Sequence, residues 1–534
     1  MKLFNKVVCG MLAAALCISA AGCGKKVAND ETPKFKLSDK YPIDTNETLR
    51  VYVKNFTPNQ YVSSLNDTEF KKYLEEATGV KIVFETAPVG SEDDGFNLML
   101  ASDDLPDVII CGGWRNPEAD SYLDDKTLTD LTPYLNGGAM PNLKKILDEN
   151  PEYDKQTKAL SGRYFYAPMI LGDDILRSYM LYVTRQDLLD KAGLQAPETV
   201  DEWEKTLTKF KEMGVKYPIT IRIDNTTTPF LSGFGVMNGF YHEGNTVKFG
   251  ANEDGYYEYL RTMARWYKNG LLDPEFVDQT SSRISQIVTS GECASFYGAV
   301  GGGLGTYMSA VSKDSGIRFA PTKAPAQTKG EKPMWNMSQS RVHQAGATIG
   351  YTSTKKELAA RFIDFGYSEK GQKIWNFGKE GVSYTMKADE NGEVYPHYTD
   401  IITDPAKRLP GTSISNVLTK YASVGNPISV QSKWYLLQVN NTPEQRLGLQ
   451  YANDTDVDKY MMPPLYIGSD KAKSVNDLAT PINTYIDEQI AKIITGRVDT
   501  EKGIGEMRDT LKKLKLDELI KMHQEAYDSY LKNN

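Results

Sequence analysis

The sequence has few of the residues that build metal sites and disulfide frameworks. It contains five cysteines and four histidines in 534 residues, and the histidines are His242, His343, His397 and His523. No two histidines stand at the spacing of a metal-binding pair, and no Cys-x-x-Cys or His-Glu-x-x-His motif occurs. We therefore expect no metal site and no cofactor, and the composition excludes a small disulfide-stabilised scaffold.

Short motifs of several enzyme classes are also missing. There is no Gly-x-Ser-x-Gly nucleophile elbow, and the glycines at 301–303 are not followed by the Lys-Ser/Thr of a phosphate-binding loop. Carboxylates are so common that pairs such as Asp93-Asp94 and Asp103-Asp104 do not indicate a glycosidase. The sequence favours a binding protein, and a secreted carbohydrate-active enzyme with a carboxylate pair is the alternative.

The chain has one prominent apolar run, and it lies at the N-terminus. Lys2 and Lys6 precede the apolar stretch 7–21, which is shorter than the roughly 20 residues that span a bilayer. This arrangement is typical of a signal peptide, which we place at residues 1–22. An ordinary secretory signal would direct the chain outside the cell.

Small residues lead directly into Cys23. Ala20, Ala21 and Gly22 precede it, and polar residues follow it. The pattern resembles the lipobox of bacterial lipoproteins, which prefers Leu where Ala20 stands. The resemblance implies that Cys23 becomes the first mature residue and carries a lipid that holds the protein on the extracellular face of the membrane. An ordinary signal peptide with an incidental cysteine is the alternative.

The mature chain is acidic and has few cysteines. Loss of Lys2 and Lys6 with the signal peptide changes the formal net charge from −8 to −10, which argues against nucleic-acid binding. Only Cys111 and Cys293 then remain besides Cys23. We expect two buried thiols, with one disulfide between them as the alternative. Residues 23–45 are polar and are predicted to form a flexible tether.

Residues 49–111 follow a β-α-β-α-β pattern. The expected elements are a strand from Leu49, a helix at 67–78, a strand at 81–85, a helix around 96–100 and a strand at 108–111. Such units form parallel sheets, and ligands bind beyond the carboxyl ends of the strands. The segments 54–56 and 112–116 leave those ends and are the first candidate binding loops.

A second series of strands and helices begins near residue 164. Its expected strands are 179–184, 219–223 and 295–297, and its expected helices begin near Thr199, Asp254 and Leu358. The last sixty residues are predicted to be mostly helical. Two α/β lobes with a helical C-terminal extension account for these elements.

Several stretches of this chain share their order and spacing with one protein family. They are residues 104–109, 128–134, 162–168, 181–203, 266–275, 377–384 and 493–496, with the helix that carries 524–530. Together they resemble the family 1 extracellular solute-binding proteins of ABC transporters, in particular the long lipoprotein members of Gram-positive bacteria. The resemblance covers residues 49–530.

The resemblance implies an α/β fold with two lobes, the type II periplasmic-binding-protein-like fold. It implies chain crossings near 168–172, 318–326 and 366–372. Lobe 1 is then expected to contain 46–170 and 326–368. Lobe 2 is expected to contain 171–325 and 369–534, including the C-terminal extension.

The resemblance also implies a function. The protein would be the lipid-anchored solute-binding component of an ABC importer, acting as a monomer. It would bind an oligosaccharide between the lobes and deliver it to the permease subunits by hinge closure. A receptor for a peptide or another non-sugar solute is the alternative.

Sugar binding needs flat aromatic surfaces and planar polar groups. Trp114 is the first candidate because it follows a buried parallel strand, where relatives place ligand contacts. The other candidate substrate-binding residues are Asn55, Arg115, Asp173, Asp174, Arg222, Tyr297, Trp335, Arg341, Trp375 and Glu380. The sequence does not choose between Asp173 and Asp174.

Some candidates have structural alternatives, and other tryptophans are assigned elsewhere. Arg222 could instead form a surface salt bridge, and Glu380 could instead brace the hinge. Trp203 and Trp266 lie on apolar helix faces and are expected in the core. Trp434 is not placed by any pattern.

Overall fold

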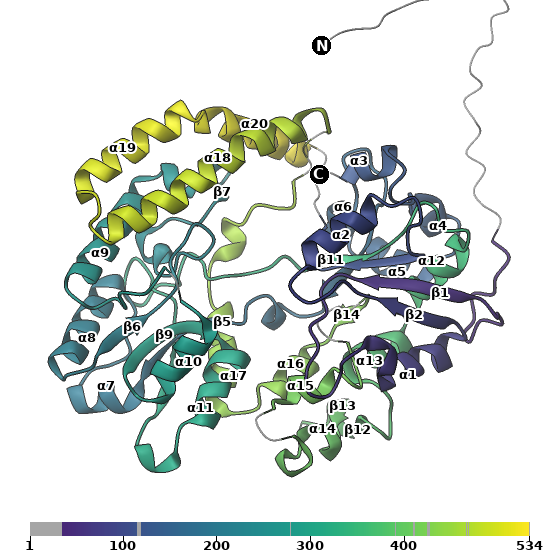
Figure 1. Ribbon diagram of the computed structural model, residues 1–534, viewed down its shortest axis with the longest axis horizontal. Coiled ribbons are helices and arrows are strands. Elements are labelled where there is room, and N and C mark those ends of the chain that lie inside the picture. Colours follow the sequence, from purple (N-terminus) through teal and green to yellow (C-terminus); the bar gives the residue numbers. More distant parts are fainter. Residues whose placement is uncertain are drawn as a thin grey trace, which may run out of the picture.

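Two α/β lobes lie side by side in the computed structural model (Figure 1). The structure describes residues 35–114, 119–277, 279–389, 391–409, 412–423, 428–465, 467 and 469–532. The expected signal peptide, Cys23 and the candidate Arg115 lie outside these residues. None of the helices in this described part combines the length and the apolar character needed to cross a bilayer.

Lobe 1 is built on a six-stranded sheet with the order β14-β4-β11-β3-β1-β2. The strands are β1 (Thr48–Val53), β2 (Lys81–Glu85), β3 (Val108–Cys111), β4 (Ala167–Leu171), β11 (Val342–Ile349) and β14 (Val430–Gln431). β1 pairs in parallel with β2 and with β3, so the predicted β-α-β-α-β unit is confirmed. β11 runs antiparallel between β3 and β4.

Lobe 1 also contains helices that surround the sheet and one hairpin that packs on these helices. They are α1 (Glu69–Thr78), α2 (Glu92–Leu100), α3 (Ala119–Asp124), α4 (Thr132–Asn136), α5 (Pro141–Glu149), α6 (Pro151–Thr157), α12 (Lys356–Phe365), α13 (Glu369–Phe377), α14 (Asp400–Thr403) and α15 (Ile414–Leu418), with the hairpin β12 (Tyr384–Ala388) and β13 (Val394–Tyr398). Gly79 ends α1 at a φ of 76°, the left-handed conformation that a C-cap glycine adopts readily.

Lobe 2 is built on a four-stranded sheet with the order β10-β5-β9-β6. Its strands are β5 (Met180–Arg185), β6 (Tyr217–Thr220), β9 (Cys293–Ala299) and β10 (Phe319–Thr322), and β7 (Phe240–Glu243) and β8 (Thr246–Phe249) form a separate hairpin. Trp203 and Trp266 are fully buried in its core, as expected. Cys111 and Cys293 are both buried, lie in different sheets and are not joined by a disulfide.

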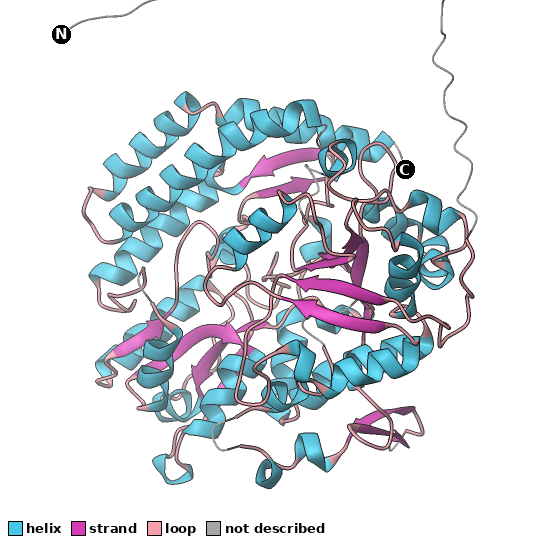
Figure 2. Ribbon diagram, turned by 45° about the vertical axis from the view of Figure 1, so that its right-hand side comes forward, coloured by secondary structure: helices cyan, strands magenta, loops and turns pink. Residues whose placement is uncertain are grey.

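The helices of lobe 2 include the C-terminal extension. They are α7 (Gln186–Ala192), α8 (Val200–Glu212), α9 (Asp254–Lys268), α10 (Ser281–Thr289), α11 (Thr306–Ala310), α17 (Pro443–Asn453), α18 (Ser469–Ile494), α19 (Thr500–Lys513) and α20 (Leu516–Lys532). The last three confirm the predicted helical C-terminus. They pack on α9 and on β8, and Figure 2 shows the β7–β8 hairpin beneath them.

The chain passes between the lobes three times. It crosses between β4 and β5, between β10 and β11, and between β14 and α17 through α16 (Lys433–Val439). The first two crossings lie near the expected positions. The third was expected at 366–372 but lies at 432–442, because Ile374, Phe377 and Leu418 belong to the core of lobe 1. The expected assignment of residues 369–431 to lobe 2 is therefore wrong.

The end of the expected tether is part of lobe 1. Ile43 is buried, and its N–H donates to the carbonyl oxygen of Thr78 (2.7 Å). The backbone N–H groups of Lys36 and Leu37 donate to the Glu357 carboxylate at 3.0 and 2.6 Å. The apolar side chains of this segment pack against the core, so residues 35–45 do not form a flexible tether.

A buried carboxylate joins α12 to the start of α5. Asp364 is fully buried and accepts hydrogen bonds from Leu143 N (2.9 Å) and from Asn142 Nδ2 (2.7 Å). Burial raises the pKa of Asp364 to about 6, although these hydrogen bonds oppose the shift. A raised carboxyl pKa means that the folded state holds this proton more tightly than the unfolded chain does.

We predict that the Asp364 contribution to stability falls as the pH rises from about 4 to about 6, by on the order of 3 kcal/mol, and is level above that range. Denaturant unfolding across this pH range would measure this contribution as the difference in the free energy of unfolding between the wild type and Asp364→Asn, whose side chain cannot titrate. The difference should change with pH in that window. A constant difference would contradict the prediction.

Candidate functional site

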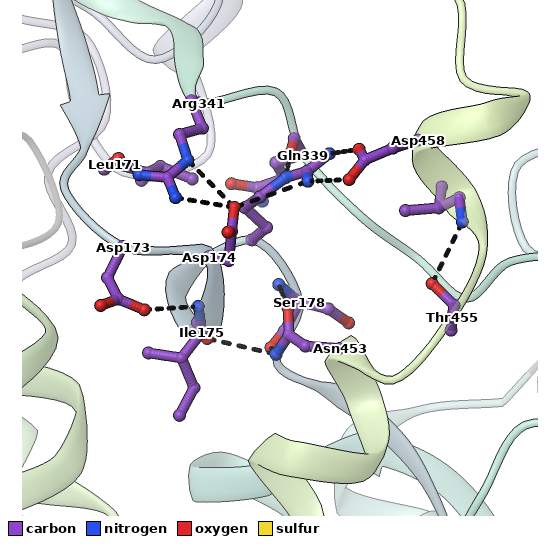
Figure 3. A network of polar contacts seen from close by, with 12 residues as sticks. Leu171, Asp173, Asp174, Ile175, Ser178, Gln339, Arg341, Asn453, Thr455 and Asp458 are labelled. Atoms are coloured by element: carbon purple, nitrogen blue, oxygen red, sulfur yellow. Dashed lines mark hydrogen bonds and ion pairs between the residues drawn. The ribbon is translucent and has the colours of Figure 1, made fainter.

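A buried arginine connects the segments that join the two lobes. Arg177, in the first crossing, is 8% exposed. Its Nε donates to the carbonyl oxygen of Gln339 in the second crossing (2.9 Å). Its terminal nitrogens donate to both carboxylate oxygens of Asp458 at 3.0 and 2.6 Å. Figure 3 shows Gln339 and Asp458 within this network.

A second arginine extends the network toward lobe 1. Arg341 binds the Asp174 carboxylate through Nε (3.0 Å) and a terminal nitrogen (2.9 Å), and it also donates to the carbonyl oxygen of Leu171 (3.4 Å) (Figure 3). Asp173 caps the following turn by accepting from Ile175 N (3.1 Å). Lys433, in the third crossing, lies 3.7 Å from Asp173. All three crossings therefore meet in one polar cluster. We call the three crossings the hinge and this group of side chains the hinge cluster.

Two asparagines hold the lobe 2 side of the hinge. Asn453 accepts from Ser178 N (3.0 Å) and donates to the Ser178 carbonyl oxygen (2.9 Å). Asn336 is buried, donates to the carbonyl oxygen of Met180 (2.7 Å) and accepts from the Tyr297 hydroxyl (2.9 Å). These bonds fix the start of β5 relative to the second crossing.

A cavity of about 390 Å³ lies above this hinge and has walls from both lobes. Lobe 1 contributes Glu152, Tyr153 and Gln156 of α6, the hinge contributes Arg177, Ser340 and Arg341, and lobe 2 contributes His242, Asp458, Met461, Met462, Pro463, Pro464, Tyr527 and Tyr530. The lining combines aromatic rings, amides and charged groups. Such a mixture can stack on a sugar face and hydrogen-bond its hydroxyl groups.

The last helix bridges the mouth of the cavity. Lys155 of α6 donates to the carbonyl oxygen of Tyr530 (2.7 Å), and its Nζ lies 3.3 Å from the centre of the Tyr530 ring. The Tyr530 hydroxyl donates to Glu152. The ring of Tyr527 stacks on His242 with their centroids 5.0 Å apart. Helices α6 and α20 thus connect the two lobes opposite the hinge.

The ion pairs set the charge of this site. Hydrogen bonds from Arg177 lower the pKa of the Asp458 carboxyl. Burial opposes the charged form of Arg341, but its interactions with Asp174 and Tyr153 together outweigh burial and raise the Arg341 pKa. These shifts favour the charged forms of Asp458 and Arg341.

Five of the candidate residues lie at or next to the hinge. Asp173, Asp174 and Arg341 belong to the cluster itself. Tyr297 contacts Asn336, and the Trp335 indole donates to the carbonyl oxygen of Val236 (2.7 Å). Arg341 also lines the cavity. A ligand contact from any of the five stays a prediction.

Two of the tryptophans expected at the cleft, Trp114 and Trp375, are core residues of lobe 1. Trp114 is 1% exposed, its indole donates to the carbonyl oxygen of Gly346 (3.1 Å), and Phe96 and Tyr122 pack edge-on against it. Trp375 is 3% exposed and packs against Phe70. Neither ring offers a face to a ligand, so the expected stacking roles are corrected.

The remaining candidates lie elsewhere. Asn55 accepts from Gly112 N (3.0 Å), so the loops after β1 and β3 are in contact, and a ligand role for Asn55 stays a prediction. Arg222 is exposed and pairs with Asp224 (2.5 Å), which is the surface salt bridge left open above. Glu380 lies in a separate groove of lobe 1 beside Lys379. Trp434 stacks on Tyr395, with centroids 3.7 Å apart.

Sequence reasoning missed most of the cavity lining. Glu152, Tyr153, Arg177, Asp458 and Tyr530 were not among the candidates, although Tyr530 lies in one of the stretches that carried the family resemblance. The one local signal for these residues in the sequence was the position of Arg177 close to a predicted crossing.

Residues 63–373 match the family described as bacterial extracellular solute-binding protein. The chain is 25% identical over 567 residues to the fructooligosaccharide ABC transporter substrate-binding protein FusA of Streptococcus pneumoniae serotype 4, covering 100% of this chain and 99% of FusA. It is 24% identical over 372 residues to the lipoprotein LipO of Bacillus subtilis, covering 64% of this chain and 68% of LipO.

Solved structures share the fold. The alginate-binding protein AlgQ2 without calcium ion superposes with a TM-score of 0.72 at 24% identity, over 91% of this chain and 98% of AlgQ2. FusA in complex with kestose superposes with a TM-score of 0.71 at 20% identity, over 91% of this chain and 100% of FusA. These similarities confirm the expected two-lobed α/β architecture.

We predict that Trp114→Ala lowers the free energy of unfolding by about 3–5 kcal/mol, because it removes a buried ring and leaves a cavity. Trp114→Phe keeps a ring and loses the bond to Gly346, so it should cost about 1–2 kcal/mol. Denaturant titration would compare the two. A loss below 1 kcal/mol for the alanine variant would show that Trp114 contributes little to the core.

Proposed function

The chain belongs to the bacterial extracellular solute-binding proteins, and on that premise we propose that it is the lipid-anchored receptor of an ABC importer that carries an oligosaccharide. The full-length similarity to FusA supports this role. The observation that carries the proposal is the cavity between the lobes, whose aromatic and hydrogen-bonding lining suits a saccharide.

Tyr153 is the aromatic surface best placed on the lobe 1 wall. It is half-buried on α6, and its hydroxyl lies near Arg341 at the hinge. Met461 and Met462 face the same cavity from lobe 2. A sugar ring held between such apolar surfaces can direct its hydroxyl groups at Gln156, Ser340 and the carboxylates.

Closure about the hinge would couple binding to transport. A ligand in this cavity touches α6 of lobe 1 and the 458–464 segment of lobe 2, so it stabilises the arrangement in which the lobes are close. The closed, loaded receptor would then dock on the permease subunits as a monomer and release the solute to them.

The anchor is the second part of the proposal. Cys23 and its small neighbours support lipid attachment, and similarity to the lipoprotein LipO favours it. The residues that the structure describes begin at Phe35 in lobe 1, and residues 24–34 would link the lipid to this point. The receptor would then remain on the extracellular face of the membrane, close to its permease.

Two other functions differ from this one in measurable ways. A receptor for a peptide would bind through the same hinge but would ignore sugars. A carbohydrate-active enzyme would convert its glycan. The curated relative that matches this chain over its full length is a substrate-binding protein, which favours binding without turnover.

We predict that calorimetric titration with kestose, raffinose, maltotriose and a set of short peptides detects binding of an oligosaccharide, with no product after incubation. Tyr153→Ala should weaken that binding about tenfold, or by roughly 1.4 kcal/mol. Tyr134→Ala is the matched control, since Tyr134 packs on Phe35 away from the cavity. Binding of peptides alone, or release of a shortened glycan, would contradict the proposed function.

We predict that Cys23→Ala releases the protein into the medium of a Gram-positive expression host, because the lipid that retains it can no longer be attached. Immunoblots of membrane and medium fractions would show the shift. Cys17→Ala, within the expected signal peptide, should leave the protein on the membrane. Retention of the Cys23 variant on the membrane would argue against the anchor.

A further inference from the structure

We infer that the cavity between the lobes selects uncharged oligosaccharides and rejects those that contain uronic acids. The inference rests on the proposed function, since it concerns the ligand class of the same cavity. The argument comes from the charged groups that line it, which are Glu152, Arg177, Arg341 and Asp458.

Neither arginine is available to a carboxylate from a ligand. Arg177 holds Asp458 with two bonds and lies 3.7 Å from Asp174. Arg341 contacts one oxygen of the Asp174 carboxylate through two of its nitrogens. Both pairings use guanidinium N–H groups that would otherwise bind an acidic sugar. A uronate would have to displace a carboxylate that the chain already provides.

The exposed fractions of the paired arginine and aspartate side chains support this conclusion. The side chains of Arg177 and Arg341 are 10% and 30% exposed, whereas those of Asp174 and Asp458 are 68% and 71% exposed. Arg177 is thus covered and Arg341 is partly covered, whereas both partner carboxylates are more open. A ligand that enters the cavity meets the carboxylates of Glu152 and Asp458 beside guanidinium groups that already have acceptors.

The lobe 1 wall of the cavity also presents a carboxylate. Glu152 accepts hydrogen bonds from the Tyr530 hydroxyl and from Gln156 Nε2 (2.8 Å), and its side chain faces the cavity. Lys155 is turned to the Tyr530 carbonyl oxygen and ring. The lining carboxylates of Glu152 and Asp458 balance the lining guanidinium groups of Arg177 and Arg341, so the lining has no excess of positive charge.

Selectivity follows from this charge pattern. Sugar hydroxyl groups donate hydrogen bonds, so open carboxylates and amides suit them. A uronate carboxylate would be desolvated beside Glu152 and Asp458, and it could bind an arginine only by displacing a carboxylate of the chain, which disfavours an acidic ligand. The cavity is therefore matched to neutral sugars.

The test compares neutral and acidic probes by calorimetry on the intact mature chain. The neutral probes are kestose, raffinose and maltotriose, and the acidic probes are trigalacturonate and an alginate trisaccharide. We expect at least one neutral probe to bind at least about a hundredfold more tightly than either acidic probe. Acidic probes that bind as tightly or more tightly would overturn this inference and leave the proposed function standing. Binding of no probe in either set would overturn both.

A variant tests the physical cause. Asp458→Asn removes the bidentate partner of Arg177, so the ratio of acidic to neutral affinity should rise at least about tenfold. Asp456→Asn is the control, because Asp456 lies in the same segment, pairs with Lys459 and is not part of the cavity lining. An unchanged ratio in the Asp458 variant would overturn the inference, and thermal unfolding would show that both variants fold.

Discussion

The hydrogen bonds of one buried guanidinium connect the first two crossings to lobe 2. Arg177 is covered, and a covered cation is stable only where acceptors surround it. Its acceptors are Gln339 and Asp458, which come from segments far away in the sequence. The distances between these groups therefore fix where the first crossing, the second crossing and the segment after α17 can lie.

Local sequence patterns were sufficient for the elements but not for all of the lobe boundaries. The alternation at Leu49–Val53 and the apolar run at 108–111 gave strands that the structure confirms, because both signals are read from neighbouring residues. The assignment of Ile374 and Leu418 to lobe 2 was wrong. An apolar helix face shows that a residue is buried, but not which of two cores buries it, so the third crossing was placed too early.

The same reasoning explains why the expected site was only partly recovered. Asp173, Asp174 and Arg341 adjoin crossings, and a crossing can be recognised from the sequence. Trp114 follows a strand that ends at the predicted edge, yet Phe96 and Tyr122 from two flanking helices cover its ring. Tyr530 reaches the cavity only because α18, α19 and α20 pack on α9 and β8, which no local pattern encodes.

The position of Tyr530 also bears on how a ligand could control the lobes. The hinge cluster fixes the floor of the cavity, whereas the opposite side is held by Lys155 and Glu152 against a single tyrosine near the chain end. Contacts between partly exposed groups of this kind contribute little individually, so they can be exchanged at low cost. A solute that touches α6 and α20 together adds contacts that the lobes alone do not make. Its binding free energy is then available to favour closure.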